Sequence, residues 1–223
     1  MAGLIAALDT DDIGQAARWA GLLQPTCPVL KLGLAFYLAH GVAGVLAIGG
    51  RVFLDLKLHD IPNTVAAAVA GILPLRPAML TVHAAGGGAM VAAARAAAGD
   101  DGPAILAVTV LTSLDDADLE AAGFAGGVEA QVLRLARVAL QAGADGLVCA
   151  PGEIAALRAE FGPDPILVVP GIRPSGAATH DQRRTATPRV AAEAGADWLV
   201  VGRPITEAAD PVEAARAIAG EIA

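Results

Sequence analysis

The feature that most restricts the fold of this sequence is an alternation of short apolar runs with longer Ala-rich segments of helical period. The alternation repeats about eight times, and each run is nearly continuous, which is typical of parallel strands covered by helices. We expect strands over 3–9, 28–34, 51–58, 78–84, 104–111, 146–149, 166–170 and 198–201. Unbroken βα units of about 28 residues predict a compact (β/α)8 TIM barrel, with residues 1–223 as a single catalytic domain.

Helix signals fall between these runs. The expected helices cover 12–23, 35–48, 62–73, 90–98, 128–142, 152–160, a short segment from 188, and 211–222. Asp11 or Asp12 can cap the first helix, and Pro62 suits the first position of the third. A doubly wound open sheet is the alternative fold. It would usually carry a GxGxxG turn after its first strand, where this chain has Asp9-Thr10-Asp11-Asp12.

The composition argues against several classes of function. The net charge is −8 and the sequence pI is about 4.9, which disfavours non-specific binding to nucleic acid or to anionic membranes. No apolar run reaches the roughly 18 residues that span a bilayer, and residues 1–9 lack the basic region of a signal peptide. Cys27 and Cys149 form no paired pattern, so we expect buried thiols in a reducing cytoplasm.

The stretch Arg51-Val-Phe-Leu-Asp-Leu-Lys-Leu-His-Asp-Ile-Pro-Asn-Thr64 reads as a buried strand that continues into a loop. Residues two apart on a strand share a face, so Asp55 and Lys57 should point the same way and the leucines the other way. A carboxylate and an ammonium that both face inward are unfavourable to bury unless they are paired. The pair either holds the fold together or takes part in catalysis.

Polar residues also occur near the carboxyl ends of the other apolar runs, where the active sites of (β/α)8 barrels lie. The full set is Asp9, Lys31, Asp55, Lys57, His83, Thr112, Arg173 and Arg203. Singly, Lys31 could extend to the surface, and His83 could be a hydrogen-bonded core histidine. Their shared position at one end of the barrel predicts a functional site.

The segments after strands seven and eight indicate an anion site. Gly171-Ile-Arg173 and Gly202-Arg203 each place a flexible backbone beside a guanidinium, whose donors match phosphate oxygens. This is a common position for phosphate in a (β/α)8 barrel. The polar segment 171–187 could close over a ligand as a lid. The other arginines near it suit a solvated surface, namely Arg183, Arg184 and Arg189.

No metal or cofactor site is predicted. The histidines do not fall at metal-ligand spacing from one another; they are His40, His59, His83 and His180. Ser113 and Ser175 lack the GxSxG setting of a nucleophilic serine, and there is no P-loop. These patterns argue against a serine hydrolase and against phosphoryl transfer.

Taken together, the motifs resemble those of the orotidine 5′-phosphate decarboxylase family, which makes UMP from orotidine 5′-monophosphate (OMP). The family's hallmark, Asp-x-Lys-x-x-Asp-Ile-Pro-Asn-Thr, is present at residues 55–64. Supporting pieces follow in the family's order over residues 4–206: Leu8-Asp9, Lys31-Leu-Gly33, Val82-His83-Ala84, Val108-Thr-Val-Leu-Thr112-Ser113, Val169-Pro-Gly-Ile-Arg173-Pro174, Asp181-Gln182-Arg183-Arg184 and Val201-Gly-Arg203-Pro-Ile205. The resemblance implies a cytoplasmic, metal- and cofactor-independent decarboxylase of de novo pyrimidine biosynthesis.

The resemblance also implies roles for the matching residues. Lys31, Asp55, Lys57 and Asp60 would form an alternating charge array, with Lys57 as the proton donor to C6 of the pyrimidine. Asp60 would come from the partner subunit of a homodimer, and Ile61 and Thr64 would cross the interface with it. Other substrate contacts would come from Asp9 and Lys31 at the ribose, His83 near it, Thr112 at the pyrimidine edge, and Arg173, Gln182 and Arg203 at the phosphate, together with Pro170 and Gly202. Gln182 would also reach towards the base.

Two features stand apart from the family pattern. His180 occupies a position where the family commonly has Gly, which bears on the conformation of the segment 171–187. The short acidic segment 114–127 has no role that the sequence assigns.

Two rival functions have to be separated from this one. Related barrels that act on pentulose or hexulose phosphates share DxKxxD, but they need Mg2+ and a carboxylate on strand two, where this chain has Lys31. A barrel that only binds a nucleotide or phosphate is the non-enzymatic alternative. The intact set of Asp55, Lys57 and Asp60 argues against it.

Overall fold

The strands of this computed structural model, which describes residues 2–174 and 184–222, close into a parallel barrel. Each strand pairs with the next, and β8 pairs with β1 to complete the ring, so the (β/α)8 prediction is confirmed and the open sheet is excluded. The strands are β1 (Gly3–Ala7), β2 (Val29–Gly33), β3 (Val52–Leu58), β4 (Met79–His83), β5 (Ala104–Val108), β6 (Gly146–Val148), β7 (Ile166–Val169) and β8 (Trp198–Val201).

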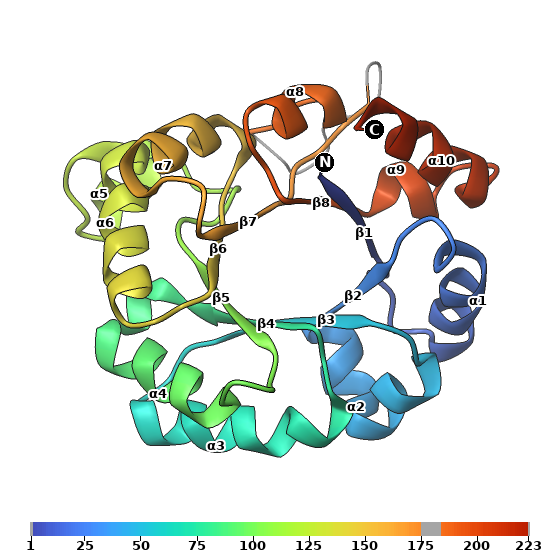
Figure 1. Ribbon diagram of the computed structural model, residues 1–223, viewed down its shortest axis with the longest axis horizontal. Helices are drawn as coiled ribbons and strands as arrows, with labels where there is room; N and C mark the ends of the chain where they lie inside the picture. Colours follow the sequence, from blue (N-terminus) through green and yellow to red (C-terminus); the bar gives the residue numbers. More distant parts are fainter. Residues whose placement is uncertain (1, 175–183, 223) are drawn as a thin grey trace.

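The helices form an outer ring around the strands (Figure 1). They are α1 (Ile13–Leu23), α2 (Leu34–Ile48), α3 (Pro62–Ile72), α4 (Gly88–Ala98), α5 (Asp116–Ala121), α6 (Gly127–Gln141), α7 (Ile154–Phe161), α8 (Pro188–Glu193), α9 (Arg203–Thr206) and α10 (Pro211–Glu221). Short 3-10 turns are η1 (Leu73–Leu75), η2 (Ala84–Gly86) and η3 (Pro151–Glu153). Within the described ranges, no helix combines the length and the apolar character that crossing a membrane requires.

The helix starts follow the capping signals of the sequence. The Asp12 carboxylate accepts a hydrogen bond from Gln15 N at 3.0 Å and caps α1, and Pro62 is the first residue of α3, as predicted. Two short helices were not predicted. The first, α5, lies in the acidic segment 114–127 and begins with a capping box formed by Asp115 and Asp118. The second, α9, directly follows β8.

The largest boundary difference is at β5, which ends three residues before the expected 111. Thr109 makes the last contact with β6, since its amide and its hydroxyl both donate to the Val148 carbonyl, at 3.3 and 3.2 Å. Beyond Thr109 the chain leaves the sheet, so Thr112 lies on a loop rather than at a strand end.

Alternate strand residues face two different apolar cores. One core lies between the barrel and the helices and includes Leu30, Leu54 and Leu80. The other fills the barrel interior and is built from Ile5, Ala7, Val29, Phe53, Met79, Leu106, Val168 and Val200. Because the period of a strand is two, residues two positions after this interior layer face the mouth of the barrel.

Two copies of Ala-Gly-Ala-Asp, at 142–145 and 194–197, hold the amino-terminal end of the barrel. In each copy the aspartate accepts a hydrogen bond from a strand amide, Ile105 N to Asp145 at 2.8 Å and Leu167 N to Asp197 at 2.7 Å. Arg158 pairs with Asp197 at 2.7 Å and also donates to carbonyls of the 162–165 turn. These contacts fix the strand starts and leave the opposite end free to build a site.

Gly146 tests how tightly β6 packs against β7. A Cβ at this position would lie 2.2 Å from the Ile166 carbonyl oxygen, which belongs to the backbone and cannot move aside cheaply. We expect Gly146→Ala to lower the free energy of unfolding by about 1–3 kcal/mol through overpacking, as measured by chemical denaturation.

Gly21→Ala is the matched control. Gly21 lies inside α1, and a Cβ added there would have no atom within 4 Å, so alanine should raise the free energy of unfolding by about 0.5–1 kcal/mol. Equal effects of the two substitutions would contradict the packing argument.

Candidate active site

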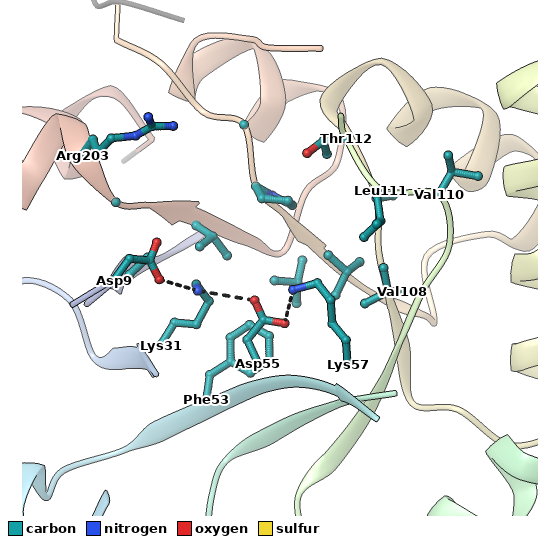
Figure 2. Close-up of a pocket in the computed structure, with 18 of the residues that line it drawn as sticks. Asp9, Lys31, Phe53, Asp55, Lys57, Val108, Val110, Leu111, Thr112 and Arg203 are labelled. Atoms are coloured by element: carbon teal, nitrogen blue, oxygen red, sulfur yellow. Dashed lines mark hydrogen bonds and ion pairs between the residues drawn. The ribbon is translucent and has the colours of Figure 1, made fainter. Parts of the chain in front are cut away.

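Four charged side chains at the carboxyl ends of β1, β2 and β3 form one chain of ion pairs (Figure 2). Lys31 Nζ lies 3.0 Å from Asp9 Oδ1 and 3.4 Å from Asp55 Oδ2. Lys57 Nζ lies 2.8 Å from Asp55 Oδ1. The order Asp9, Lys31, Asp55, Lys57 alternates in sign, so each charge has an opposite neighbour. We call this set the charge array.

The strand period places two members of the charge array above the barrel interior. Lys31 follows the interior residue Val29 by two positions, and Asp55 follows Phe53 in the same way. Lys57 continues the series, but its backbone departs from a regular strand, with φ at 50°. The sequence therefore predicted correctly that Asp55 and Lys57 meet, but it did not predict the irregular backbone that brings them together.

Burial and ion pairing shift the pKa values of Asp55 and Lys31 in opposite directions. Burial alone would raise the pKa of Asp55, but the ammonium groups of Lys31 and Lys57 outweigh it and hold that pKa below its usual value. Burial likewise works to lower the pKa of Lys31, yet the carboxylates of Asp55 and Asp9 raise it above the usual value. Both directions keep Asp55 and Lys31 ionised at neutral pH.

The charge array borders a cavity at the mouth of the barrel. Figure 2 shows Arg203 and Thr112 on the side of this cavity away from Asp55. The other predicted residues that line it are Pro170, Arg173 and Gly202. The cavity is thus lined by the four alternating charges of the charge array and by two arginines, Arg173 and Arg203.

Several predicted residues do not line this cavity. Asp60, Ile61 and Thr64 are exposed on this chain, past the end of β3 and at the start of α3. His83 instead stacks on His59, with ring centroids 5.4 Å apart. Burial, with help from His59 and Lys57, lowers the pKa of His83, which favours its neutral form. Gln182 and His180 lie outside the described residues, as does most of the proposed lid.

The expectation that Arg184 is a solvated surface residue is wrong. Its guanidinium pairs with the buried carboxylate of Glu153 and donates to the Leu111 carbonyl at 2.9 Å. Glu153 also accepts a hydrogen bond from Ala150 N at 2.8 Å. These contacts join the loops after β5, β6 and β7 beside the cavity. No sequence pattern indicated them, because the two partners are 31 residues apart.

Metal-ligating side chains do not gather in the described residues. Across residues 2–174 and 184–222, no three His, Cys, Asp or Glu side chains are arranged as they would be around a metal ion. Cys149 lines the cavity but is buried, and burial raises the pKa of its thiol. A thiol of this kind is a poor nucleophile at neutral pH.

Sequence and structure comparisons with known proteins point to one family. The model of the orotidine 5′-phosphate decarboxylase / HUMPS family matches residues 3–218. Orotidine 5′-phosphate decarboxylase from Gluconobacter oxydans is 53% identical, with 99% of this chain and 97% of the relative covered. The same enzyme from an Anaeromyxobacter species is 56% identical over 97% and 96%. The crystal structure of the Lactobacillus acidophilus enzyme superposes with a TM-score of 0.88 at 37% identity, covering 100% and 99% of the two chains.

Removal of the central carboxylate tests the charge array. Asp55→Asn leaves the nearly buried Lys31 facing Lys57 without a shared counter-charge, so we expect the free energy of unfolding at about pH 7 to fall by roughly 3 kcal/mol. The pKa of Asp55 is lowered from 3.8 in the folded state, so its contribution is present above 3.8 and is lost as pH falls further. Chemical denaturation at several pH values should therefore show the gap to wild type narrowing in acid.

Asp100→Asn provides the comparison. Asp100 pairs with Arg95 at 3.6 Å but is fully exposed, so its removal should change stability little at any pH. An Asp55→Asn protein as stable as this control near neutral pH would contradict the role given to Asp55.

Proposed function

The chain belongs to the orotidine 5′-phosphate decarboxylase / HUMPS family, and we propose that Lys57 is the proton donor of its reaction. The protein is a lyase that decarboxylates OMP to UMP in pyrimidine biosynthesis. The observation that supports the role of Lys57 best is its 2.8 Å contact with Asp55 at the edge of a cavity that also carries two arginines.

The chemistry explains why an ammonium is needed at this point. Cleavage of the bond between C6 and the carboxylate releases CO2 and leaves the electron pair on C6, with no adjacent group to delocalise it. A fixed ammonium beside C6 stabilises that charge electrostatically. Its proton then moves from Nζ to C6 and completes UMP.

Asp55 has two effects in this proposal. Its charge holds the Lys57 ammonium in place, since the two groups form an ion pair 2.8 Å apart. A substrate carboxylate bound beside Asp55 meets a like charge, and this repulsion is relieved when the carboxylate leaves as neutral CO2.

The remaining substrate contacts in this proposal are those that the family resemblance implies for the matching residues. Asp9 and Lys31 would hold the ribose hydroxyls, and Thr112 would contact the edge of the pyrimidine. Arg173, Arg203 and Gln182 would bind the phosphate, with Pro170 and Gly202 beside them and His83 near the ribose. Two arginines that line the cavity, Arg173 and Arg203, suit a dianion that does not itself react.

We also propose that the reaction needs no metal ion or cofactor. Position 31, on the second strand, carries a lysine that is paired with Asp9 and Asp55, so it offers no carboxylate to a cation. The ammonium groups of Lys31 and Lys57 would supply the positive charge that a metal ion supplies in other decarboxylations.

A homodimer would add Asp60 of the partner subunit to the charge array, and so complete the predicted set of Lys31, Asp55, Lys57 and Asp60. Asp60, Ile61 and Thr64 are exposed on one chain, and Ile61 is 66% accessible. Apolar residues four apart on α2 are exposed as well: Leu34, Leu38, Val42 and Leu46. A second copy covering this apolar surface would bring its Asp60 to the neighbouring site, and its Ile61 and Thr64 with it.

The proposed setting is the cytoplasm, with residues 1–223 acting as a single catalytic domain. Cys27 and Cys149 are both buried free thiols, as suits a reducing compartment.

Lys57→Ala tests the proton donor. It should lower kcat for OMP by about 10³-fold or more, because the lost group acts mainly in the transition state. The affinity for UMP should stay within a few-fold of wild type in titration calorimetry. Arg203→Ala should instead act mainly on binding, with a large loss of UMP affinity. A Lys57→Ala protein with near-normal kcat would overturn the assignment.

The same assay addresses the metal-dependent alternative. Wild-type turnover of OMP should persist in EDTA. Turnover that stops in EDTA and returns with Mg2+ would contradict a metal-independent mechanism.

Subunit mixing tests the shared site. Lys57→Ala and Asp60→Ala homodimers should both be inactive, whereas their heterodimer has one site with neither change. After random exchange, about a quarter of the wild-type activity per protomer should return, because half of the dimers carry one intact site. No recovery in confirmed heterodimers would argue against Asp60 acting across the interface.

The control mixes Lys57→Ala with Asp55→Ala. These two residues pair within one chain, so every site in such a heterodimer carries one change and activity should not return.

A further inference from the structure

The irregular backbone at Lys57 has a specific partner on β4. Leu54 pairs with Leu80, but the next pair along the strands is Leu58 with Val82. β3 therefore places residues 55–57 opposite a single β4 residue, Thr81. A bulge of this kind disrupts the local ladder, so some backbone groups of β3 need other hydrogen-bond partners.

The Thr81 hydroxyl is the partner of one of these backbone groups. It accepts a hydrogen bond from Lys57 N at 2.8 Å and donates one to Asp55 Oδ1 at 3.0 Å. The directions are unambiguous, because an ionised carboxylate only accepts and a backbone amide only donates. A single hydroxyl thus links the backbone amide of Lys57 to the Asp55 carboxylate. The Lys57 ammonium contacts that same carboxylate.

The Lys57 backbone needs this support. Its φ of 50° lies in the left-handed region, which is unfavourable for a residue with a side chain and persists only where the surroundings hold it. The Thr81 side chain is completely buried, and it does not line the cavity. Removing its hydroxyl would take away the acceptor of the Lys57 amide at a position where the Thr81 side chain itself is completely buried.

We propose that Thr81 is a positioning residue for the decarboxylation, which fixes Lys57 Nζ through the Lys57 amide and the Asp55 carboxylate. The inference rests on the proposed function of Lys57 and adds a requirement for the β4 hydroxyl. Thr81 does not touch the substrate. Its effect therefore falls on the alignment of the proton donor and not on the binding of the phosphate at Arg173 and Arg203.

A second buried threonine offers a matched control. Thr109 at the end of β5 is also fully buried, and its hydroxyl donates to the Val148 carbonyl at 3.2 Å. Its hydroxyl bonds to that carbonyl and not to the charge array, and Thr109 does not line the cavity. Thr109→Val thus removes a buried hydroxyl and its hydrogen bond without touching Asp55 or Lys57.

The test compares Thr81→Val, Thr81→Ser, Thr81→Ala and Thr109→Val with wild type. For each protein, kcat and KM for OMP, the affinity for UMP and the Tm are measured. Thr81→Val should lower kcat by about 10- to 100-fold, the range expected when a buried amide loses its partner. KM and UMP affinity should change less than about threefold, because the phosphate contacts are intact.

Thr81→Ser keeps the hydroxyl and should retain kcat within about threefold of wild type, whereas Thr81→Ala should resemble the valine variant. The Ser and Ala variants differ only in the hydroxyl, so their comparison decides the question even if Thr81→Val does not fold. Thr109→Val should keep wild-type kcat, whatever Tm it loses.

The outcomes separate three cases. Loss of kcat in the variants that lack the Thr81 hydroxyl, with rescue by serine, supports the proposal. Equal kcat values for Thr81→Ser and Thr81→Ala overturn it, as does an equal loss in Thr109→Val. A wild-type protein without OMP turnover would instead refute the proposed function.

Discussion

The site depends on how Asp55 is shared between two ammonium groups. Its Oδ2 faces Lys31, and its Oδ1 accepts hydrogen bonds from Lys57 and Thr81. With both oxygens engaged, the carboxylate has little freedom to rotate, so it fixes Lys57 as well as neutralising it. A nearly buried Lys31 without such a partner would tend to lose its proton. The same carboxylate therefore makes two lysines tolerable in the barrel mouth and sets their spacing.

The sequence predicts the barrel well because the barrel follows from local pattern. Near-continuous apolar runs, the helix cap at Asp12, the helix start at Pro62 and the strand period each depend on residues close in the chain. The bulge in β3 does not. Residues 51–58 alternate like those of a regular strand, and only the register against β4 reveals that three residues stand opposite Thr81. For this reason the left-handed backbone of Lys57 could not be predicted from the sequence.

The site residues also differ in whether a local pattern or a contact between distant elements defines them. Asp9, Lys31, Asp55 and Lys57 were predictable because charged residues at strand ends break an apolar pattern. Thr81 was missed because threonine is common in strands and breaks no pattern. Arg184 was misassigned because its partner, Glu153, belongs to another loop, and a polar setting in sequence says little about burial in space. Contacts between residues of distant elements are thus the feature of the site that a single sequence does not predict.

Strands carry the charged groups proposed to act on the reacting carbon, and segments that follow strands carry the proposed phosphate ligands, for a physical reason. Groups that act on the reacting carbon must be held within fractions of an ångström, and strands of a closed barrel provide that rigidity. The proposed phosphate contacts tolerate more freedom, so arginines on the segments after β7 and β8 would suffice. The net charge of −8 does not oppose binding of an anion there, because salt screens surface charges beyond about 8 Å. Arg173 and Arg203 line the cavity itself, so in the proposed complex local charge would govern recognition, while the global charge governs only the behaviour of the protein in solution.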